Sequence, residues 1–367
     1  MQTLRRLLWP FSLLYGVIMQ VRNFLFDRGI IKSASFPVPV IGIGNLSTGG
    51  TGKTPHVEYL IRLLQKEYKI ATLSRGYGRH TKGFLLLKSP ANTWMYGDEP
   101  MQYFTKFPGV RVSVGEDRTA AIEELMRLNP KIEIILMDDA FQHRHVKPGH
   151  SILLIEYDSI FKTDFMLPAG NLREPFSGKK RADTIIITKS PNILVPIERK
   201  RILERLEPLE HQQVFFSFYK YGEFNRVTGK QTGMLMGASY YMEKRFTILM
   251  VTGIANPSGL LEYLRRHTDK LETLIFPDHH EFSTKDIRKI QETFDNIANQ
   301  SKIIVTTEKD AMRLQNPELE PLISNLPLFY LPIEVAFHQD ETGFNNRIMD
   351  YLKKNPAANR MIQSSTR

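Results

Sequence analysis

The sequence contains no cysteine among its 367 residues. This absence excludes disulfide bonds, thiolate nucleophiles and cysteine metal sites, and it fits a reducing compartment without proving one. Internal repeats and low-complexity segments are also missing. Hydrophobic residues make up 42% of the chain and charged residues 24%, which is typical of a globular protein. Because one hydrophobic core rarely serves a chain of this length, we expect two domains.

Long apolar runs are absent as well. The most apolar stretch, residues 7–19, is too short and too interrupted for a confident transmembrane helix. It is not followed by the small-residue cleavage site of a signal peptide. It contains Trp9 and Tyr15 and is flanked by Arg5 and Arg22. This pattern favours a helix in the interface of an anionic membrane, and a helix that packs on the protein's own core is the alternative.

The net charge of +10 favours an anionic partner, such as a phosphate compound, a nucleic acid or an acidic membrane surface. The sequence contains no recognised nucleic-acid module and no clustered basic helix, so we expect no nucleic-acid partner.

Residues 39–55 are the stretch around which the chain is organised. An apolar run typical of a buried strand leads into a glycine-rich turn, and an amphipathic helical pattern follows. Such a turn lets backbone N–H groups surround a polyphosphate at a helix N-terminus. The expected nucleotide-binding residues are Ser47, Thr48, Gly49, Gly50, Thr51, Gly52, Lys53 and Thr54. We expect Lys53 to reach the β- and γ-phosphates and Thr54 to bind Mg²⁺.

Ser47 departs from the usual pattern G-x-x-x-x-G-K-S/T, which has glycine at this position. A dinucleotide-binding pattern that starts at Gly42 fails at the same residue. The combination of strand, glycine-rich turn and helix nevertheless favours a phosphate-binding loop over a turn that only reverses the chain.

Two further strands end in polar residues. Residues 131–137 form an apolar strand that is followed by Asp138 and Asp139, as expected for the acidic strand that holds Mg²⁺ in P-loop proteins. Residues 69–73 form a strand that is followed by Arg75 and Tyr77, at the end where α/β sheets bind ligands. His143 follows the acidic strand, and both a structural and a catalytic role are open for it.

Two other acidic segments have simpler interpretations. Asp98 and Glu99 precede Pro100, and this spacing alone predicts residues that cap a helix. His279 and His280 lie between acids, but adjacent histidines in a loop rarely bind one ion well. We therefore expect no dedicated metal site there.

The pattern of elements predicts an α/β protein with a P-loop domain built on a parallel sheet and a second, smaller α/β domain. The expected divisions are an N-terminal membrane-associated helix, the P-loop domain, a linker or β-ribbon, the second domain and a polar tail, at residues 1–32, 33–215, 216–244, 245–355 and 356–367.

Several segments together resemble the tetraacyldisaccharide 4′-kinase family, the lipid A 4′-kinases. They are residues 44–55, 74–77, 97–100, 138–143, 172–174 and 278–280, in the family's order. The family shares the unusual residue at the position of Ser47. The resemblance implies transfer of the ATP γ-phosphoryl group to the 4′-hydroxyl of an acylated disaccharide 1-phosphate, with Mg²⁺, at the cytoplasmic face of the bacterial inner membrane. It also implies two α/β domains joined by a β-ribbon.

The resemblance also implies residue roles. Asp98 becomes a catalytic base rather than a cap, with support from His279, although His280 could be the matching residue. Asp138 or Asp139 supplies the Mg²⁺-binding carboxylate, and we assign Asp138 to the metal and Asp139 with Lys53 to catalysis. The expected substrate-binding residues are Arg75, Tyr77, Glu99, Arg118, Gln142, His143, Arg173 and Glu174. We expect a monomer.

The alternative function is a non-catalytic, membrane-associated P-loop switch or a partitioning ATPase. Such ATPases place a signature lysine directly before the two glycines of the loop, where this chain has Thr48. A GTPase would need N-K-x-D or T-K-x-D, and the segments 188–191 and 307–310 do not match either pattern.

Overall fold

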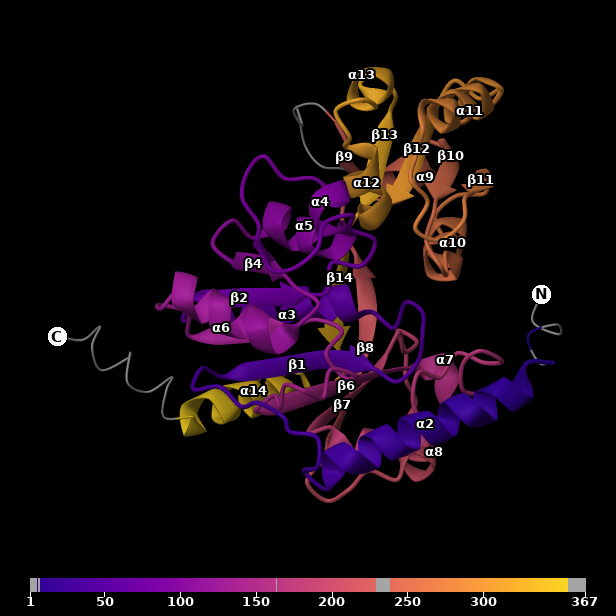
Figure 1. Ribbon diagram of the computed structural model, residues 1–367. Coiled ribbons are helices and arrows are strands. Elements are labelled where there is room, and N and C mark those ends of the chain that lie inside the picture. Colours follow the sequence, from indigo (N-terminus) through magenta and orange to yellow (C-terminus); the bar gives the residue numbers. More distant parts are fainter. Residues whose placement is uncertain (1–4, 6, 163, 229–237, 356–367) are drawn as a thin grey trace.

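The computed structural model describes residues 5, 7–162, 164–228 and 238–355, and these form two α/β domains stacked one above the other (Figure 1). The expected polar tail at 356–367 and part of the expected linker, 229–237, lie outside the described residues.

The lower domain is built on a nine-stranded sheet in the described part of the chain, in the order β14-β8-β7-β6-β1-β5-β2-β4-β3. All neighbouring strands are parallel except for the two antiparallel edge pairs, β14 with β8 and β3 with β4. The strands are β1 Val40–Asn45, β2 Ile70–Ser74, β3 Leu85–Leu86, β4 Arg111–Val114, β5 Ile134–Met137, β6 His150–Glu156, β7 Thr184–Thr188, β8 Gln213–Tyr221 and β14 Ile333–Phe337. The central strands are continuous apolar runs because helices cover both faces of the sheet.

The upper domain has a five-stranded sheet among the described residues, in the order β11-β10-β12-β13-β9. Only β9 is antiparallel to its neighbour. The strands are β9 Asn225–Arg226, β10 Thr247–Thr252, β11 Leu271–Ile275, β12 Lys302–Thr307 and β13 Leu328–Leu331.

The helices that surround these sheets vary from one turn to five. They are α2 Trp9–Asp27, α3 Lys53–Leu64, α4 Thr93–Tyr96, α5 Asp98–Lys106, α6 Arg118–Leu128, α7 Tyr157–Ile160, the 3₁₀ helix η1 Phe176–Arg181, α8 Pro196–Leu206, α9 Ala238–Glu243, α10 Ser258–Arg265, α11 Thr284–Asp295, α12 Glu308–Leu314, α13 Glu320–Ile323 and α14 Glu341–Lys354.

The division between the domains differs from the predicted one. The second domain was expected to extend to residue 355, but β14 and α14 return to the lower sheet, where Phe344, Ile348 and Leu352 are buried in its core. The lower domain also includes all of β8, beyond its predicted end at 215. The paired strands β8 and β14 form an antiparallel ribbon that leads toward the upper domain (Figure 1). The prediction failed because a short amphipathic helix gives no signal of which core it joins.

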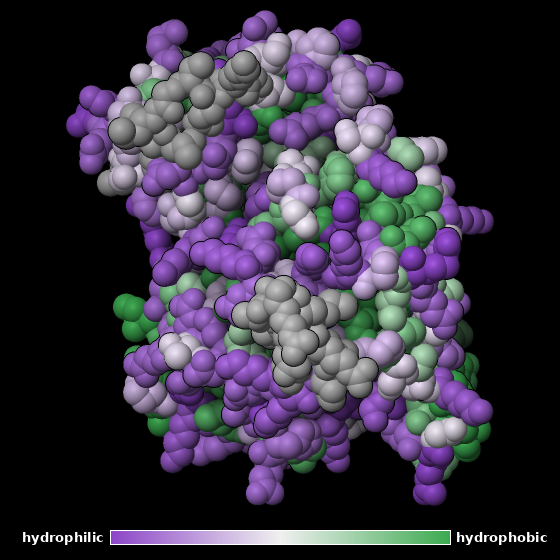
Figure 2. Space-filling view, turned by 90° about the vertical axis from the view of Figure 1, so that its left-hand side faces the viewer, coloured by the Kyte–Doolittle hydropathy of each residue, from purple (hydrophilic) through white to green (hydrophobic). Residues whose placement is uncertain are grey.

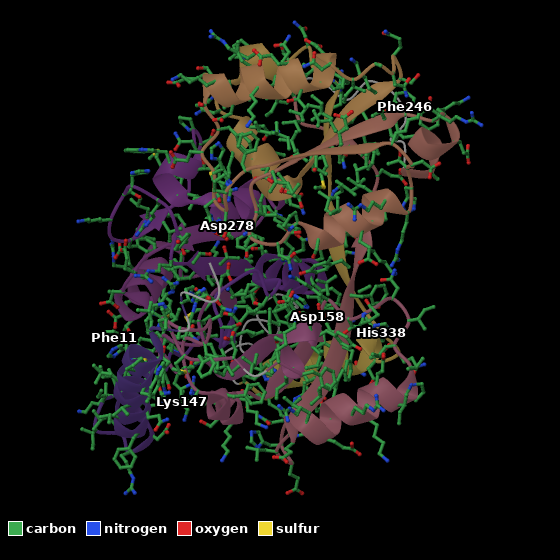
Figure 3. The ribbon with its side chains drawn as sticks, turned by 90° about the vertical axis from the view of Figure 1, so that its right-hand side faces the viewer. Phe11, Lys147, Asp158, Phe246, Asp278 and His338 are labelled. Atoms are coloured by element: carbon green, nitrogen blue, oxygen red, sulfur yellow. The ribbon has the colours of Figure 1, made fainter. Side chains whose placement is uncertain are left out.

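The amino-terminal helix α2 exposes most of its apolar side chains. Phe11 is 62% exposed and lies at the margin of the molecule (Figure 3), and only three residues of the helix are buried. The exposed large apolar residues of the segment are Leu7, Leu8, Trp9, Phe11, Leu13, Leu14, Val17, Ile18, Val21 and Phe24. By contrast, hydrophilic residues cover most of the face that Figure 2 shows. Within the described ranges, no helix is long and apolar enough to cross a membrane.

Candidate active site

The phosphate-binding loop connects β1 to α3 at the centre of the lower sheet. Gly52 occupies the position before α3 with φ +90°, a conformation that glycine adopts without the strain of a side chain. A Cβ atom at this position would lie 2.2 Å from the hydroxyl oxygen of Tyr219. The Thr188 hydroxyl donates to the carbonyl oxygen of Thr51 (2.9 Å), which anchors the loop to β7.

His56 fixes the beginning of α3. Its Nδ1 lies 2.7 Å from the carbonyl oxygen of Gly52, and its Nε2 lies 3.0 Å from the hydroxyl of Ser217 on β8. A carbonyl only accepts hydrogen bonds, so the proton sits on Nδ1 and Nε2 accepts from Ser217. Burial lowers the pKa of His56 to about 4, which keeps the ring neutral.

Lys53 and the two aspartates after β5 meet beside this loop. The Nζ atom of Lys53 lies 3.3 Å from Oδ1 of Asp139, and Arg173 donates to both carboxylate oxygens of Asp139 at 3.0 and 2.9 Å. Burial alone would raise the pKa of Asp139, but the charges of Lys53 and Arg173 outweigh it and lower the pKa to about 2. Asp139 is therefore a carboxylate that already has two cationic partners.

Asp138 has a different environment. Its Oδ2 accepts a hydrogen bond from the hydroxyl of Tyr103 (2.8 Å), whereas its buried Oδ1 has no partner among the described residues. Burial, followed by the charge of Glu99, raises the pKa of Asp138 to about 6. An unpartnered, buried carboxylate oxygen beside a phosphate-binding loop fits a cation ligand.

The described residues contain no cluster of three or more histidine, aspartate or glutamate side chains that could hold a metal ion. Mg²⁺ in nucleotide sites needs no such cluster, because it takes one or two protein ligands and completes its shell with phosphate and water oxygens. Thr54 and Asp138 both line the same cleft and fit this role.

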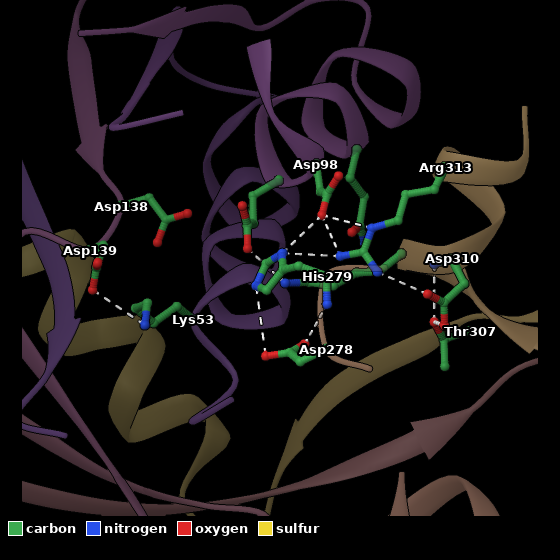
Figure 4. A network of polar contacts seen from close by, with 12 residues as sticks. Lys53, Asp98, Asp138, Asp139, Asp278, His279, Thr307, Asp310 and Arg313 are labelled. Atoms are coloured by element: carbon green, nitrogen blue, oxygen red, sulfur yellow. Dashed lines mark hydrogen bonds and ion pairs between the residues drawn. The ribbon is translucent and has the colours of Figure 1, made fainter. Parts of the chain in front are cut away.

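A second polar network joins the two domains (Figure 4). Asp98, the first residue of α5, accepts a hydrogen bond from Nε of Arg313 on α12 (2.9 Å) and another from Nη2 of Arg313, both on Oδ2. The same oxygen lies 3.3 Å from Nδ1 of His279, in the loop after β11. His280 instead pairs with Asp286 at 3.1 Å. The geometry therefore brings His279, and not its neighbour, to Asp98.

Asp98 is held as a carboxylate. Burial alone would raise its pKa, but the hydrogen bonds from His279 and Arg313 outweigh burial and lower the pKa to about 2. Gly97 is the N-cap of α5 and Asp98 is its first helical residue, so Asp98 does not occupy the capping position.

Both networks border one cleft of about 1420 Å³ between the domains. Most of the expected site residues line it, namely Thr48, Gly49, Gly50, Thr51, Gly52, Lys53, Thr54, Arg75, Tyr77, Glu99, Asp138, Asp139, Gln142, His143, Arg173 and His279. In Figure 3, Asp278 marks the level at which the two domains meet. Asp98 lies directly behind His279 and Arg313, with 13% of its side chain exposed.

Besides Asp98, three expected site residues do not line the cleft. Ser47 pairs with Leu172 as an isolated bridge. Arg118 is only 2% exposed and donates to the carbonyl oxygens of Gly115 and Asp138, so it supports the acidic strand from behind. Burial lowers its pKa to about 10.

Glu174 is 1% exposed and accepts hydrogen bonds from Arg181, Gln142 and Asn23. Arg118 and Glu174 are thus buried and bonded to protein groups in this structure, and neither of them lines the cleft.

His143 lines the cleft, and burial followed by the charge of Arg118 lowers its pKa to about 4. A neutral ring is thus its stable form near neutral pH. The ring of Tyr77 contacts the ring of His279 in a tilted arrangement, with 4.9 Å between centroids and an angle of 55° between the planes.

Comparison with known proteins agrees with this arrangement. A family model described as tetraacyldisaccharide-1-P 4′-kinase matches residues 4–353. The chain belongs to this family. A tetraacyldisaccharide 4′-kinase of Bacteroides thetaiotaomicron is 46% identical over 95% of this chain and 93% of its own length. A tetraacyldisaccharide 4′-kinase of Flavobacterium johnsoniae is 46% identical over 97% of this chain and 99% of its own length. The crystal structure of LpxK from Aquifex aeolicus in complex with ATP has a TM-score of 0.71 and 30% identity, and covers 95% of this chain and 99% of that one.

The family resemblance did not reveal Arg313 or Lys309, and no expected site residue was assigned at either position. Lys309 donates to Oε1 of Glu99 at 2.7 Å. Like the contact of Arg313 with Asp98, this contact joins α12 to α5. No sequence signal links positions 215 residues apart. The one local indication is that cationic residues at 309 and 313 share a helical face next to the strand β12.

Proposed function

We propose that this protein transfers the γ-phosphoryl group of ATP to the 4′-hydroxyl of tetraacyldisaccharide 1-phosphate, a step of lipid A biosynthesis. The observation that carries the proposal is an interdomain cleft that is lined by the phosphate-binding loop on one side and by His279, the partner of Asp98, on the other. The membership of the kinase family supports the same reaction.

The lower domain would bind the triphosphate. Backbone N–H groups of the loop and the charge of Lys53 would neutralise phosphate oxygens. Thr54 and Asp138 would hold Mg²⁺, which supplies positive charge to the phosphates when bound. Asp139, fixed by Arg173, orients the ammonium group of Lys53 through their 3.3 Å contact.

The acceptor hydroxyl would react beside the second network. As the new bond from the acceptor oxygen to phosphorus forms and the bond from phosphorus to the leaving oxygen of ADP breaks, Asp98 takes the hydroxyl proton. A weakly basic carboxylate suits this role because the proton can leave late in a loose transition state. Oδ1 of Asp98 accepts no hydrogen bond from the described residues and is the oxygen available for that proton.

The helix α2 connects the cleft to a membrane surface in this proposal. Tyr15, Met19 and Arg22 line the cleft. Tyr15 donates to the carbonyl oxygen of Arg173 (3.0 Å), while the apolar residues on the other side of α2 are exposed. A helix that packs only on its own core would bury these residues instead. We infer that α2 lies in the interface of an anionic membrane and that the lipid acceptor enters between α2 and the sheet.

The reaction can be tested with purified protein, ATP, Mg²⁺ and acylated disaccharide 1-phosphate in detergent. We expect ADP formation that depends on the acceptor. The alternative, a P-loop switch or partitioning ATPase, predicts ATP hydrolysis that the acceptor does not stimulate. Acceptor-independent hydrolysis without phosphorylated lipid would reject the kinase proposal.

The membrane role can be tested with vesicles that contain anionic lipid. Replacing Phe11, Leu14 and Ile18 by aspartate removes three exposed side chains, each worth about 1.5–3 kcal/mol when fully buried in an apolar phase. Vesicle binding should therefore fall more than about tenfold. The matched control is Phe161→Asp, which changes an exposed aromatic residue outside α2. Equal binding of the triple variant and the wild type would exclude α2 as the anchor.

A further inference from the structure

Arg313 makes contacts on both sides of the interdomain cleft. Its Nε and Nη2 atoms donate to Oδ2 of Asp98 in the lower domain. Its Nη1 atom donates to the carbonyl oxygen of Gly253 (2.9 Å) and to Oδ1 of Asp310 (3.0 Å), both in the upper domain. Figure 4 shows the guanidinium between the two carboxylates. Only 6% of the Arg313 side chain is exposed.

The anchor in the upper domain is rigid. Asp310 is fully buried, and its Oδ2 accepts hydrogen bonds from the hydroxyls of Thr252 (2.9 Å) and Thr307 (2.7 Å) and from the N–H of Gly253 (3.1 Å). These donors come from the ends of β10 and β12. Arg313 therefore has an anchor in the upper domain that is separate from its contacts with Asp98.

His279 cannot replace Arg313 as a permanent donor. Its Nδ1 lies 3.3 Å from Oδ2 of Asp98 and 3.2 Å from Nη2 of Arg313, so it meets an acceptor and a donor at once. It donates to Asp98 only when Nδ1 carries the proton. A guanidinium keeps its proton in proteins and donates through a planar fork in every state of the histidine.

We propose that Arg313 is a positioning residue of the phosphoryl-transfer site: from the upper domain it fixes Oδ2 of Asp98, which keeps this carboxylate ionised and turns Oδ1 toward its proton-accepting role when the domains are in contact. This inference rests on the proposed function, because it assigns the orientation of the base to that reaction. It means that the lower domain, which binds the triphosphate, has an oriented base only after the upper domain docks.

The charges around Asp98 define the expected pH dependence. His279, Arg313 and Lys309 are the cationic or titratable groups that face it, and Glu99 is its acidic neighbour on α5. An arginine beside an aspartate lowers the carboxyl pKa by about 1–3 units. Loss of the guanidinium should therefore move the acidic limb of the kcat profile up by about 1–3 pH units.

The test measures kcat, KM for ATP and the pH profile of acceptor phosphorylation for Arg313→Gln and Arg313→Lys. The Gln variant should lose about 10–100-fold in kcat, since misplaced catalytic groups cost rates of this order. The acidic limb of its kcat profile should move to higher pH. Its affinity for ATP should stay within about twofold of the wild-type value, because Arg313 is placed on the acceptor side. The Lys variant keeps the charge but not the fork, so its acidic limb should stay nearer to the wild-type value while kcat falls.

Two further variants separate positioning from loss of structure. In an Asp98→Asn background, Arg313→Gln should cause little additional loss in kcat, because the arginine acts through that carboxylate. The matched control is Lys106→Gln, which removes the ion pair of Lys106 with Glu308 (2.8 Å) at the other end of the α5–α12 contact. It should lower the unfolding temperature without moving the acidic limb.

The outcomes are distinguishable. A wild-type protein that does not phosphorylate the acceptor would refute the proposed function itself. An active wild type with unchanged kcat and acidic limb in Arg313→Gln, or additive losses with Asp98→Asn, would overturn the role of Arg313. If the Gln variant does not fold, the Lys variant decides: wild-type kcat overturns the inference, and a reduced kcat with unchanged ATP affinity supports it.

Discussion

The replacement Gly52→Ala tests the geometry of the phosphate-binding loop. A Cβ at this residue would lie 2.2 Å from the Tyr219 hydroxyl oxygen, and the next nearest atom is Cζ of the same ring at 3.4 Å. The left-handed φ of +90° costs an alanine about 1–2 kcal/mol. Relief of the overlap costs about 1–3 kcal/mol more, as for other overpacked sites. We therefore expect Gly52→Ala to lower the free energy of unfolding by about 2–5 kcal/mol.

The two contributions can be separated by urea unfolding of matched variants. Gly49 has φ +106° and open space around its Cβ position, so Gly49→Ala should show the backbone cost alone. Gly50 also has open space around its Cβ position but no left-handed φ, so Gly50→Ala should be close to neutral. In Gly52→Ala/Tyr219→Phe the overlapping oxygen is gone, and about 1–3 kcal/mol should return. If Gly52→Ala is no less stable than Gly49→Ala, or if the phenylalanine restores nothing, the close contact does not limit this loop.

Three further predictions concern charge and pH. Lys53→Ala should lower kcat by about 100-fold or more while the protein stays folded, because a cation in the site is lost; near-normal turnover would contradict the P-loop assignment. Asp138→Ala should raise the Mg²⁺ concentration needed for half-maximal activity, whereas Asp98→Ala should lower kcat with an unchanged Mg²⁺ titration. A shifted titration in Asp98→Ala would contradict its role as base. His56 has a folded pKa of about 4, below its unfolded value of 6.5, so its stabilising effect is present above pH 6.5 and is lost as pH falls toward 4. Relative to His56→Gln, the wild type should therefore lose up to ~3 kcal/mol of unfolding free energy over that range. If the free energy of unfolding depends on pH in the same way for both proteins, His56 has no such effect.

The local patterns of the sequence predicted the strand, loop and helix around residues 39–55. The strand, glycine-rich turn and helix at residues 39–55 form the loop as expected, and Asp138 and Asp139 follow the neighbouring strand β5. These features depend on residues close together in the chain, and the edge of a parallel sheet brings their ends to one place. The α/β class and the number of domains were predictable for the same reason.

The acceptor side was harder to predict because it depends on contacts between distant segments. Spacing alone suggested that Asp98 caps a helix, and only the family resemblance suggested a base with His279 nearby. Arg313 was missed altogether, since its partner Asp98 lies 215 residues away. Arg118 and Glu174 were expected to contact substrate, but motif membership cannot distinguish a residue that faces the cleft from one that supports it.

The position of the transferred phosphate is the measurement that tests the central claim most directly. The wild-type protein should be incubated with ATP labelled in the γ-phosphoryl group and with acylated disaccharide 1-phosphate, alongside the same acceptor without its 4′-hydroxyl. The account predicts one labelled phosphate on the 4′-oxygen of the intact acceptor and none on the altered one. Equal labelling of both acceptors, or release of the label only as inorganic phosphate, would contradict it.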